Sequence, residues 1–272
     1  MNLQTFVASD RTRIAYTVDD YTDPWREPQT LFLTHSAMSS SRRMYAMVPY
    51  LAREFRVVRM DTRGHGASQV PPADSTLSLD RLTQDLHELT EHLGVERAHF
   101  MGSAAGGYLS QQMAIHHPRK VLSAILVASK PGLRNSQAAS WIPEIERKGL
   151  RPFLKETISD RFPPGTDPAQ IEWFLDEVCK NDLDYIKRFI LHMTGLYWMD
   201  DVAHIRCPTL IIAPGDEPIG DGSAYGEMQR RIPDCELIVY EGGRHNIGDY
   251  LGDRCAQDAL AFLRRRFGQA RM

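Results

Sequence analysis

The chain alternates between short apolar runs and longer amphipathic stretches. Apolar runs typical of buried strands lie at residues 31–35, 55–60, 121–129, 208–214 and 235–240. Residues 3–8 and 12–18 flank a turn-forming tetrad and predict an antiparallel hairpin. Leucines at helical spacing predict a helix over 77–94. Buried strands separated by helices favour a mostly parallel sheet that binds ligands at the carboxyl ends of its strands.

The alternation of strand and helix patterns stops between residues 131 and 204. Three helical patterns follow one another there with no strand between them. A helical block of this length is too long for a simple crossover, so we expect an inserted helical cap (lid). The predicted organisation is therefore an α/β core of residues 1–130 and 205–272, closed by an amphipathic helix over 255–267, with the cap at 131–204.

Residues 97–113 join a short apolar run to a helical pattern through a turn of small residues. A strand that passes directly into a helix holds its corner residue exposed, with a positive φ, and needs small neighbours so that the two backbones can approach. Gly102, Gly106 and Gly107 are these neighbours, and the corner residue is Ala104. Chemistry at such a corner normally uses a serine, so the site lacks its nucleophile.

Composition narrows the range of partners. The 272 residues carry a formal net charge of −3, which gives no general attraction to nucleic acid or anionic membranes. The four cysteines show neither zinc-ligand spacing nor a disulfide framework, and no run is long and apolar enough to span a membrane. We expect a cytoplasmic protein with reduced thiols, a small-molecule substrate, and no metal or other cofactor. The oligomeric state is left open, a homodimer being one option.

Nucleophilic acyl transfer needs a base, an acid that orients the base, and two N–H donors for the oxyanion, besides the nucleophile. His245 is the candidate base, because it follows the last apolar run in a glycine-containing loop. Asp216 and Glu217 follow the run at 208–214, and both are plausible acids. His116 and His117 stand at a predicted helix end and are expected at the surface.

At this point the chain resembles the α/β-hydrolases, and most of all the branch of 3-oxoadipate enol-lactonases and related esterases. The resemblance rests on the motifs LFLTHSA (31–37), DTRGHGAS (61–68), MGSAAGGY (101–108), PTLIIAPGDEPI (208–219) and GGRH (242–245). It implies the α/β-hydrolase fold, a mostly parallel eight-stranded sheet with helices on both faces and an inserted helical cap. The glycines, Asp61 and Arg63 of DTRGHGAS are expected to hold a loop rather than to take part in chemistry.

The resemblance also implies roles for individual residues. It places the triad acid on Glu217, with Asp216 as the fallback, and the oxyanion donors on the backbone N–H groups of Ala37 and Ala105. Position 104 is that of the nucleophile. Cofactor-free dioxygenases of this fold use a histidine and an acid that follows the sixth strand, but the corresponding stretch here, 128–132, contains no carboxylate.

Three explanations of Ala104 stay open. The chain is an engineered Ser→Ala variant, a natural homologue that binds or works by its base alone, or an enzyme that uses Ser103 instead. We favour the first, because the base, the acid loop and the flanking glycines are retained. Ser103 is least favoured, because Met101 would then occupy the place of a small neighbour.

The resulting hypothesis is a hydrolase of a small ester or lactone, inactivated by Ala104. The alternatives are a carbon–carbon bond hydrolase or a dioxygenase, and a non-catalytic ligand-binding protein. A carboxylate-bearing substrate is considered because Arg42 and Arg43 could clamp it, although both also suit a solvated helix start. Trp141 and Trp198 are candidates for contact with the substrate, whereas the arginines of the helical block (Arg134, Arg151, Arg161 and Arg188) are expected at the surface.

Overall fold

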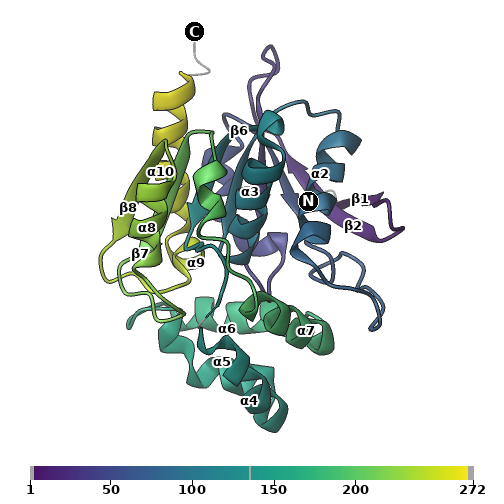
Figure 1. Cartoon of the computed structure of the whole chain (residues 1–272), viewed down its shortest axis with the longest axis vertical. Coiled ribbons are helices and arrows are strands. Elements are labelled where there is room, and N and C mark those ends of the chain that lie inside the picture. Colours follow the sequence, from purple (N-terminus) through teal and green to yellow (C-terminus); the bar gives the residue numbers. More distant parts are fainter. Residues whose placement is uncertain (1–2, 135, 269–272) are drawn as a thin grey trace.

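The apolar runs form the strands of one sheet in the computed structural model, which describes residues 3–134 and 136–268 (Figure 1). Within these residues the strands are β1 (Leu3–Val7), β2 (Arg13–Asp19), β3 (Thr30–Thr34), β4 (Arg56–Met60), β5 (Ala98–Ser103), β6 (Val121–Val127), β7 (Thr209–Pro214) and β8 (Cys235–Tyr240). Their order is β1-β2-β4-β3-β5-β6-β7-β8. Only the pairs β1–β2 and β2–β4 are antiparallel among these described strands. The prediction of a mostly parallel eight-stranded sheet is confirmed. The predicted chain limits at residues 1 and 272 lie outside the described residues.

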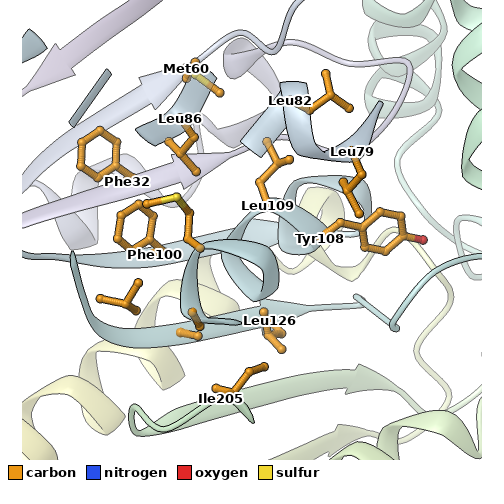
Figure 2. Close-up of a cluster of buried hydrophobic side chains, with 14 of the residues drawn as sticks. Phe32, Met60, Leu79, Leu82, Leu86, Phe100, Tyr108, Leu109, Leu126 and Ile205 are labelled. Atoms are coloured by element: carbon orange, nitrogen blue, oxygen red, sulfur yellow. The ribbon is translucent and has the colours of Figure 1, made fainter. Parts of the chain in front are cut away.

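Helices cover both faces of the sheet. They are α1 (Val48–Leu51), α2 (Leu79–His92), α3 (Ala105–His116), α8 (Ala224–Arg231), α9 (Ile247–Tyr250) and α10 (Gly252–Phe267). One apolar cluster packs α2, α3 and α8 against the sheet, and a second packs α1, α9 and α10 against its other face. In the first cluster the rings of Phe32 and Phe100 stack with their centroids 5.2 Å apart beneath the leucines of α2 (Figure 2). This packing fixes β3 and β5, whose carboxyl ends reach the candidate site.

Helix α2 is shorter than the stretch 77–94 predicted for it. It begins after Ser78, whose hydroxyl accepts a hydrogen bond from the N–H of Arg81 and so caps the first turn. Leu77 therefore lies before the helix, although it still packs against the core. The pattern of leucines identified the buried face correctly but not the end of the helix, which a polar side chain decides.

Residues 131–204 form a helical group at one end of the molecule, apart from the helices that flank the sheet (Figure 1). The group contains α4 (Trp141–Lys148), α5 (Leu150–Glu156), α6 (Pro168–Val178) and α7 (Leu183–Thr194). These helices share a separate apolar cluster that includes Ile145, Leu154 and Ile186. An isolated bridge between Gly132 and Tyr197 joins the beginning and the end of the segment. We call residues 131–204 the helical segment.

Candidate active site

Ala104 stands at the corner between β5 and α3 in a strained conformation. Its φ is 46° and its ψ is −113°, a region that non-glycine residues rarely adopt. Two hydrogen bonds to the backbone of Ala104 hold the corner. The N–H of Ala104 donates to the carbonyl of Val127 at 2.8 Å, and its carbonyl accepts from the hydroxyl of Ser129 at 2.8 Å. The methyl group consequently faces the cavity described below.

The small residues around this corner are required by the approach of the two backbones. A Cβ on Gly106 would lie 2.4 Å from the carbonyl oxygen of Thr34, and one on Gly102 would lie 2.3 Å from the carbonyl carbon of Gly106. A Cβ on Gly107 would meet the hydroxyl of Ser129 at 2.3 Å. All three predicted glycines therefore lie where a side chain would force helix and strand apart.

Glu217 and His245 meet at the ends of β7 and β8. The imidazole Nδ1 lies 2.9 Å from Oε2 and 3.1 Å from Oε1 of Glu217. A carboxylate can only accept, so Nδ1 carries the proton and Nε2 keeps its lone pair when the ring is neutral. Asp216, the fallback, is exposed on the surface. The structure thus brings Glu217, and not Asp216, to the imidazole.

Two further side chains hold the carboxylate of Glu217. The hydroxyl of Tyr225 donates to Oε2 at 2.8 Å, and the ammonium of Lys130 lies 3.4 Å from the same oxygen. Burial by itself raises the pKa of Glu217, but His245, Lys130 and Tyr225 outweigh it and lower this pKa to about 2. The acid is therefore ionised at any pH at which the protein would work.

The two predicted oxyanion donors belong to residues that line the same cavity as Ala104 and His245. Ala105 is the first residue of α3, where a backbone N–H has no acceptor within its own helix. Ala37 lies in the loop after β3. His35 fixes this loop, because its Nδ1 donates to the carbonyl of Ser36 at 2.7 Å and its Nε2 accepts from the N–H of Thr62 at 3.0 Å.

The cavity lies between the sheet edge and the helical segment. Ala104, Ala105 and His245 line it from the core, and apolar side chains that include Trp141, Phe174 and Ile190 line it from the helical segment. It also receives three cationic side chains, Arg43, Lys130 and Arg161. A largely apolar cavity with a few polar groups is typical of a site for a small organic molecule.

The candidates for substrate contact divide into two pairs. Trp141 and Arg43 line the cavity, but the guanidinium of Arg43 forms two hydrogen bonds, of 2.8 and 2.6 Å, with Asp249. Arg42 and Trp198 lie outside the lining. Arg42 is more than half exposed and lies 3.5 Å from Glu177. Trp198 is buried with its indole N–H donating to Gln111 on α3 at 2.9 Å, because a buried indole needs an acceptor.

Ser103, the alternative nucleophile, is buried and lies outside the cavity lining. Its Oγ is 2.8 Å from the position that a Cβ on Gly248 would take, so the hydroxyl points toward α9. The alternation of side chains along a strand places residues 103 and 104 on different sides. The structure presents Ala104 to the cavity and directs Ser103 elsewhere.

The loop 61–68 has the supporting contacts expected of it. Asp61 accepts hydrogen bonds from the N–H groups of Ser41 and Ala67, at 2.6 and 2.8 Å. Arg63 forms a double hydrogen bond with Asp85 and a single one with Asp10. Neither side chain lines the cavity, and both link this loop to neighbouring elements.

Sequence reasoning missed several groups at this site. Lys130 is one of them, although a cation directly after a buried strand is itself a signal of a site at that sheet edge. Nothing in the sequence indicates that Tyr225 would reach Glu217 from α8. Arg161 was expected at the surface, and this was wrong: its side chain is buried. Asn246 also lines the cavity and was overlooked.

In the described part of the chain, no group of three or more His, Cys, Asp or Glu side chains is placed to hold a metal ion. No helix among these residues is long and apolar enough to cross a membrane.

Comparison with known proteins agrees with this architecture. A family model described as alpha/beta hydrolase fold matches residues 29–162. The chain is 26% identical over 197 residues to 3-oxoadipate enol-lactonase 2 of Acinetobacter baylyi, covering 71% of each protein. It is 25% identical to the putative carbamate hydrolase RutD of Pseudomonas syringae, covering 82% of this chain and 89% of that protein. A hydrolase structure from Pseudomonas aeruginosa superposes with a TM-score of 0.85 at 27% identity, covering 96% of this chain and 98% of that one. The relatives support a hydrolase in general terms, and the chain has the α/β-hydrolase fold.

Proposed function

We propose that this site is built to hydrolyse a small ester or lactone, and that the chain with Ala104 binds such a substrate without cleaving it. The observation that carries the proposal is the hydrogen bond of 2.9 Å between Glu217 and His245, because both His245 and the strained corner at Ala104 line one cavity. A base oriented by a buried acid beside such a corner is the arrangement that activates a hydroxyl nucleophile.

With serine at position 104, each group has a defined task. The Oγ attacks the carbonyl carbon while Nε2 of His245 takes the hydroxyl proton, and the carbonyl electrons move onto the oxygen. The N–H groups of Ala37 and Ala105 stabilise this oxyanion. When the carbonyl re-forms, the bond to the leaving oxygen breaks and the imidazolium returns the proton to it. Water then releases the acyl group in the same way, with His245 as the base.

Ala104 leaves the site without a nucleophile in this chain. A methyl group cannot form the acyl bond, and the loss of a triad nucleophile typically leaves only about 10³- to 10⁴-fold acceleration over water. The same observation favours a second candidate, a ligand-binding homologue in which no turnover takes place. The two candidates share the cavity and differ in whether the proton path through His245 can be used.

Ala104→Ser separates these candidates. The expected result is turnover of p-nitrophenyl acetate or of a simple lactone, with kcat/KM at least about 10³-fold above that of the Ala104 chain. Ala104→Gly is the matched control, because it changes the same corner without adding a nucleophile. A folded Ala104→Ser protein that binds esters and cleaves none of them would leave the binding protein as the better account.

A further inference from the structure

Arg161 is a buried cation with an unused donor. It follows the short helix Ile158–Asp160, and its side chain is only 3% exposed. The Nη1 donates to the carbonyl and to the hydroxyl of Thr157, both at 3.0 Å, and the guanidinium lies over the ring of Trp141 at 5.3 Å. The Nη2 is buried and has no hydrogen-bond partner among the described residues. The side chain lines the cavity of the candidate active site.

The other two cations of the cavity are neutralised from within the protein. Arg43 is paired with Asp249 at 2.6 Å, and Lys130 lies 3.4 Å from Glu217. Arg161 forms no ion pair within 4 Å in the described part of the chain. Burying a charge without a hydrogen-bonded counter-charge costs several kcal/mol, so the free donor of Arg161 calls for an acceptor that the described residues do not supply. Burial and the neighbouring charge of Arg43 lower the pKa of Arg161 to about 10 against the opposing effect of Asp160, which leaves the guanidinium charged at neutral pH.

A second unused donor stands beside it. Asn246 is 8% exposed and lines the same cavity, and its Nδ2 is buried without a partner among the described residues. The backbone N–H of Asn246 donates to the carbonyl of Arg161 at 3.1 Å. The N–H of His245 donates to the carbonyl of Asp160 at 3.3 Å. These bonds fix both donors to the loop that carries the candidate base.

We infer that Arg161 and Asn246 form an anion subsite that holds a carboxylate of the substrate. The inference rests on the proposed function, because the subsite opens into the same cavity. Both unused groups are donors, so the ligand must supply acceptor oxygens, and the cation favours an ionised group. The rest of the cavity lining is mostly apolar. The substrate is therefore an ester or lactone with a short hydrocarbon body and one free carboxylate, such as a half-ester of a dicarboxylic acid.

The chain with Ala104 allows a direct binding test, because it cannot consume the ligand. Isothermal titration calorimetry at pH 7.5 compares monomethyl adipate with dimethyl adipate, which differ in one ionised group. We expect the half-ester to bind at least tenfold more tightly. In Arg161→Gln this preference should fall to about twofold or less. Arg147→Gln removes the same charge from an exposed position of the helical segment and should keep the preference.

Two more variants distinguish loss of the anion subsite from misfolding. Asn246→Asp is nearly isosteric and supplies Arg161 with an internal counter-charge, so it should also abolish the preference. Arg161→Lys keeps the charge and should retain part of it. Circular dichroism and thermal melting establish that each variant is folded. Equal affinity for both ligands in the starting chain, or an equal loss for both in Arg161→Gln, would overturn the anion subsite.

Turnover in the Ala104→Ser background separates failure of the subsite from failure of the proposed function. If Ala104→Ser hydrolyses both esters at the same kcat/KM, the subsite is wrong and the hydrolase stands. If it hydrolyses neither, while calorimetry still shows a preference that depends on Arg161, the hydrolase is wrong and the anion subsite stands. Support for both requires a higher kcat/KM for the half-ester, lost through KM in Arg161→Gln.

Discussion

The two sides of the cavity differ in how their polar groups are satisfied. On the sheet side, Glu217 is held by His245, Tyr225 and Lys130, so the acid and the base are oriented before any ligand arrives. On the side of the helical segment, Arg161 keeps a buried donor without a partner in the described residues. Chemistry needs a preorganised arrangement, whereas recognition needs a group that the ligand itself completes. We therefore attribute reaction type to the sheet edge and substrate choice to Arg161 of the helical segment, assisted by Asn246 of the neighbouring loop.

The sharpest test of the sheet side is the removal of one charge from Glu217. In the Ala104→Ser background, Glu217→Gln keeps the shape of the side chain but loses the carboxylate that orients His245. We expect kcat to fall by about 10⁴-fold with little change in KM, because the acid acts on the base and not on substrate binding. Asp216→Asn removes the same charge from the exposed neighbour and serves as the control in the same esterase assay. Equal losses in the two variants would refute the assignment of the acid.

The second test addresses the corner that presents residue 104. Gly106→Ala places a methyl group 2.4 Å from the carbonyl oxygen of Thr34, so α3 must move away from β3. We expect a loss of about 3 kcal/mol in the free energy of unfolding, the upper range for overpacking, measured by urea denaturation. Gly195→Ala, in the helical segment, meets its nearest atom at 3.5 Å and should be close to neutral. A Gly106→Ala protein as stable as the starting chain would show that the tight corner is not required.

Sequence reasoning predicts position best where a short stretch carries its own geometry. The corner at 104, the acid loop and the histidine loop each follow a strand, so their apolar runs and glycines place them at the same edge of the sheet. The helical segment is different, because the surroundings of its side chains depend on contacts over long separations. Trp198 faces Gln111, 87 residues earlier, and Arg161 is tied to the loop of His245 and Asn246. No local pattern could show that Trp198 lies outside the cavity lining and that Arg161 lies within it.

The third test concerns the junction between the two sides. His65, in the loop after β4, packs against Tyr185 and Phe189 of α7, with ring centroids 5.7 and 5.0 Å away. Burial, helped by the neighbouring His35, lowers the pKa of His65 to about 3. The unfolded chain takes up this proton below about pH 6.5 and the folded chain does not, so stability falls as the pH drops from 6.5 toward 3. At pH 5 this group alone costs about 2 kcal/mol.

His65→Gln removes this titration. The difference in unfolding free energy between pH 7.5 and pH 5.0 should shrink by about 2 kcal/mol relative to the starting chain, as measured by urea denaturation at each pH. His116→Gln, at an exposed position of α3, should change this difference much less. If both variants keep the full acid sensitivity, the junction at His65 is not where the protein responds to acid.

The smallest expected effects come from two tryptophans that the sequence could not tell apart. Trp198→Phe keeps the aromatic packing against Tyr108 but leaves the amide oxygen of Gln111 without its donor, which should cost about 1 kcal/mol of stability. Because Trp198 lies outside the cavity lining, KM in the Ala104→Ser background should stay within about twofold. Trp141→Phe removes part of the surface on which Arg161 rests and should raise KM for the half-ester several-fold. A change in KM for Trp198→Phe as large as that for Trp141→Phe would mean that the ligand reaches beyond this cavity toward α3, and the division between a chemical side and a recognition side would then have to be redrawn.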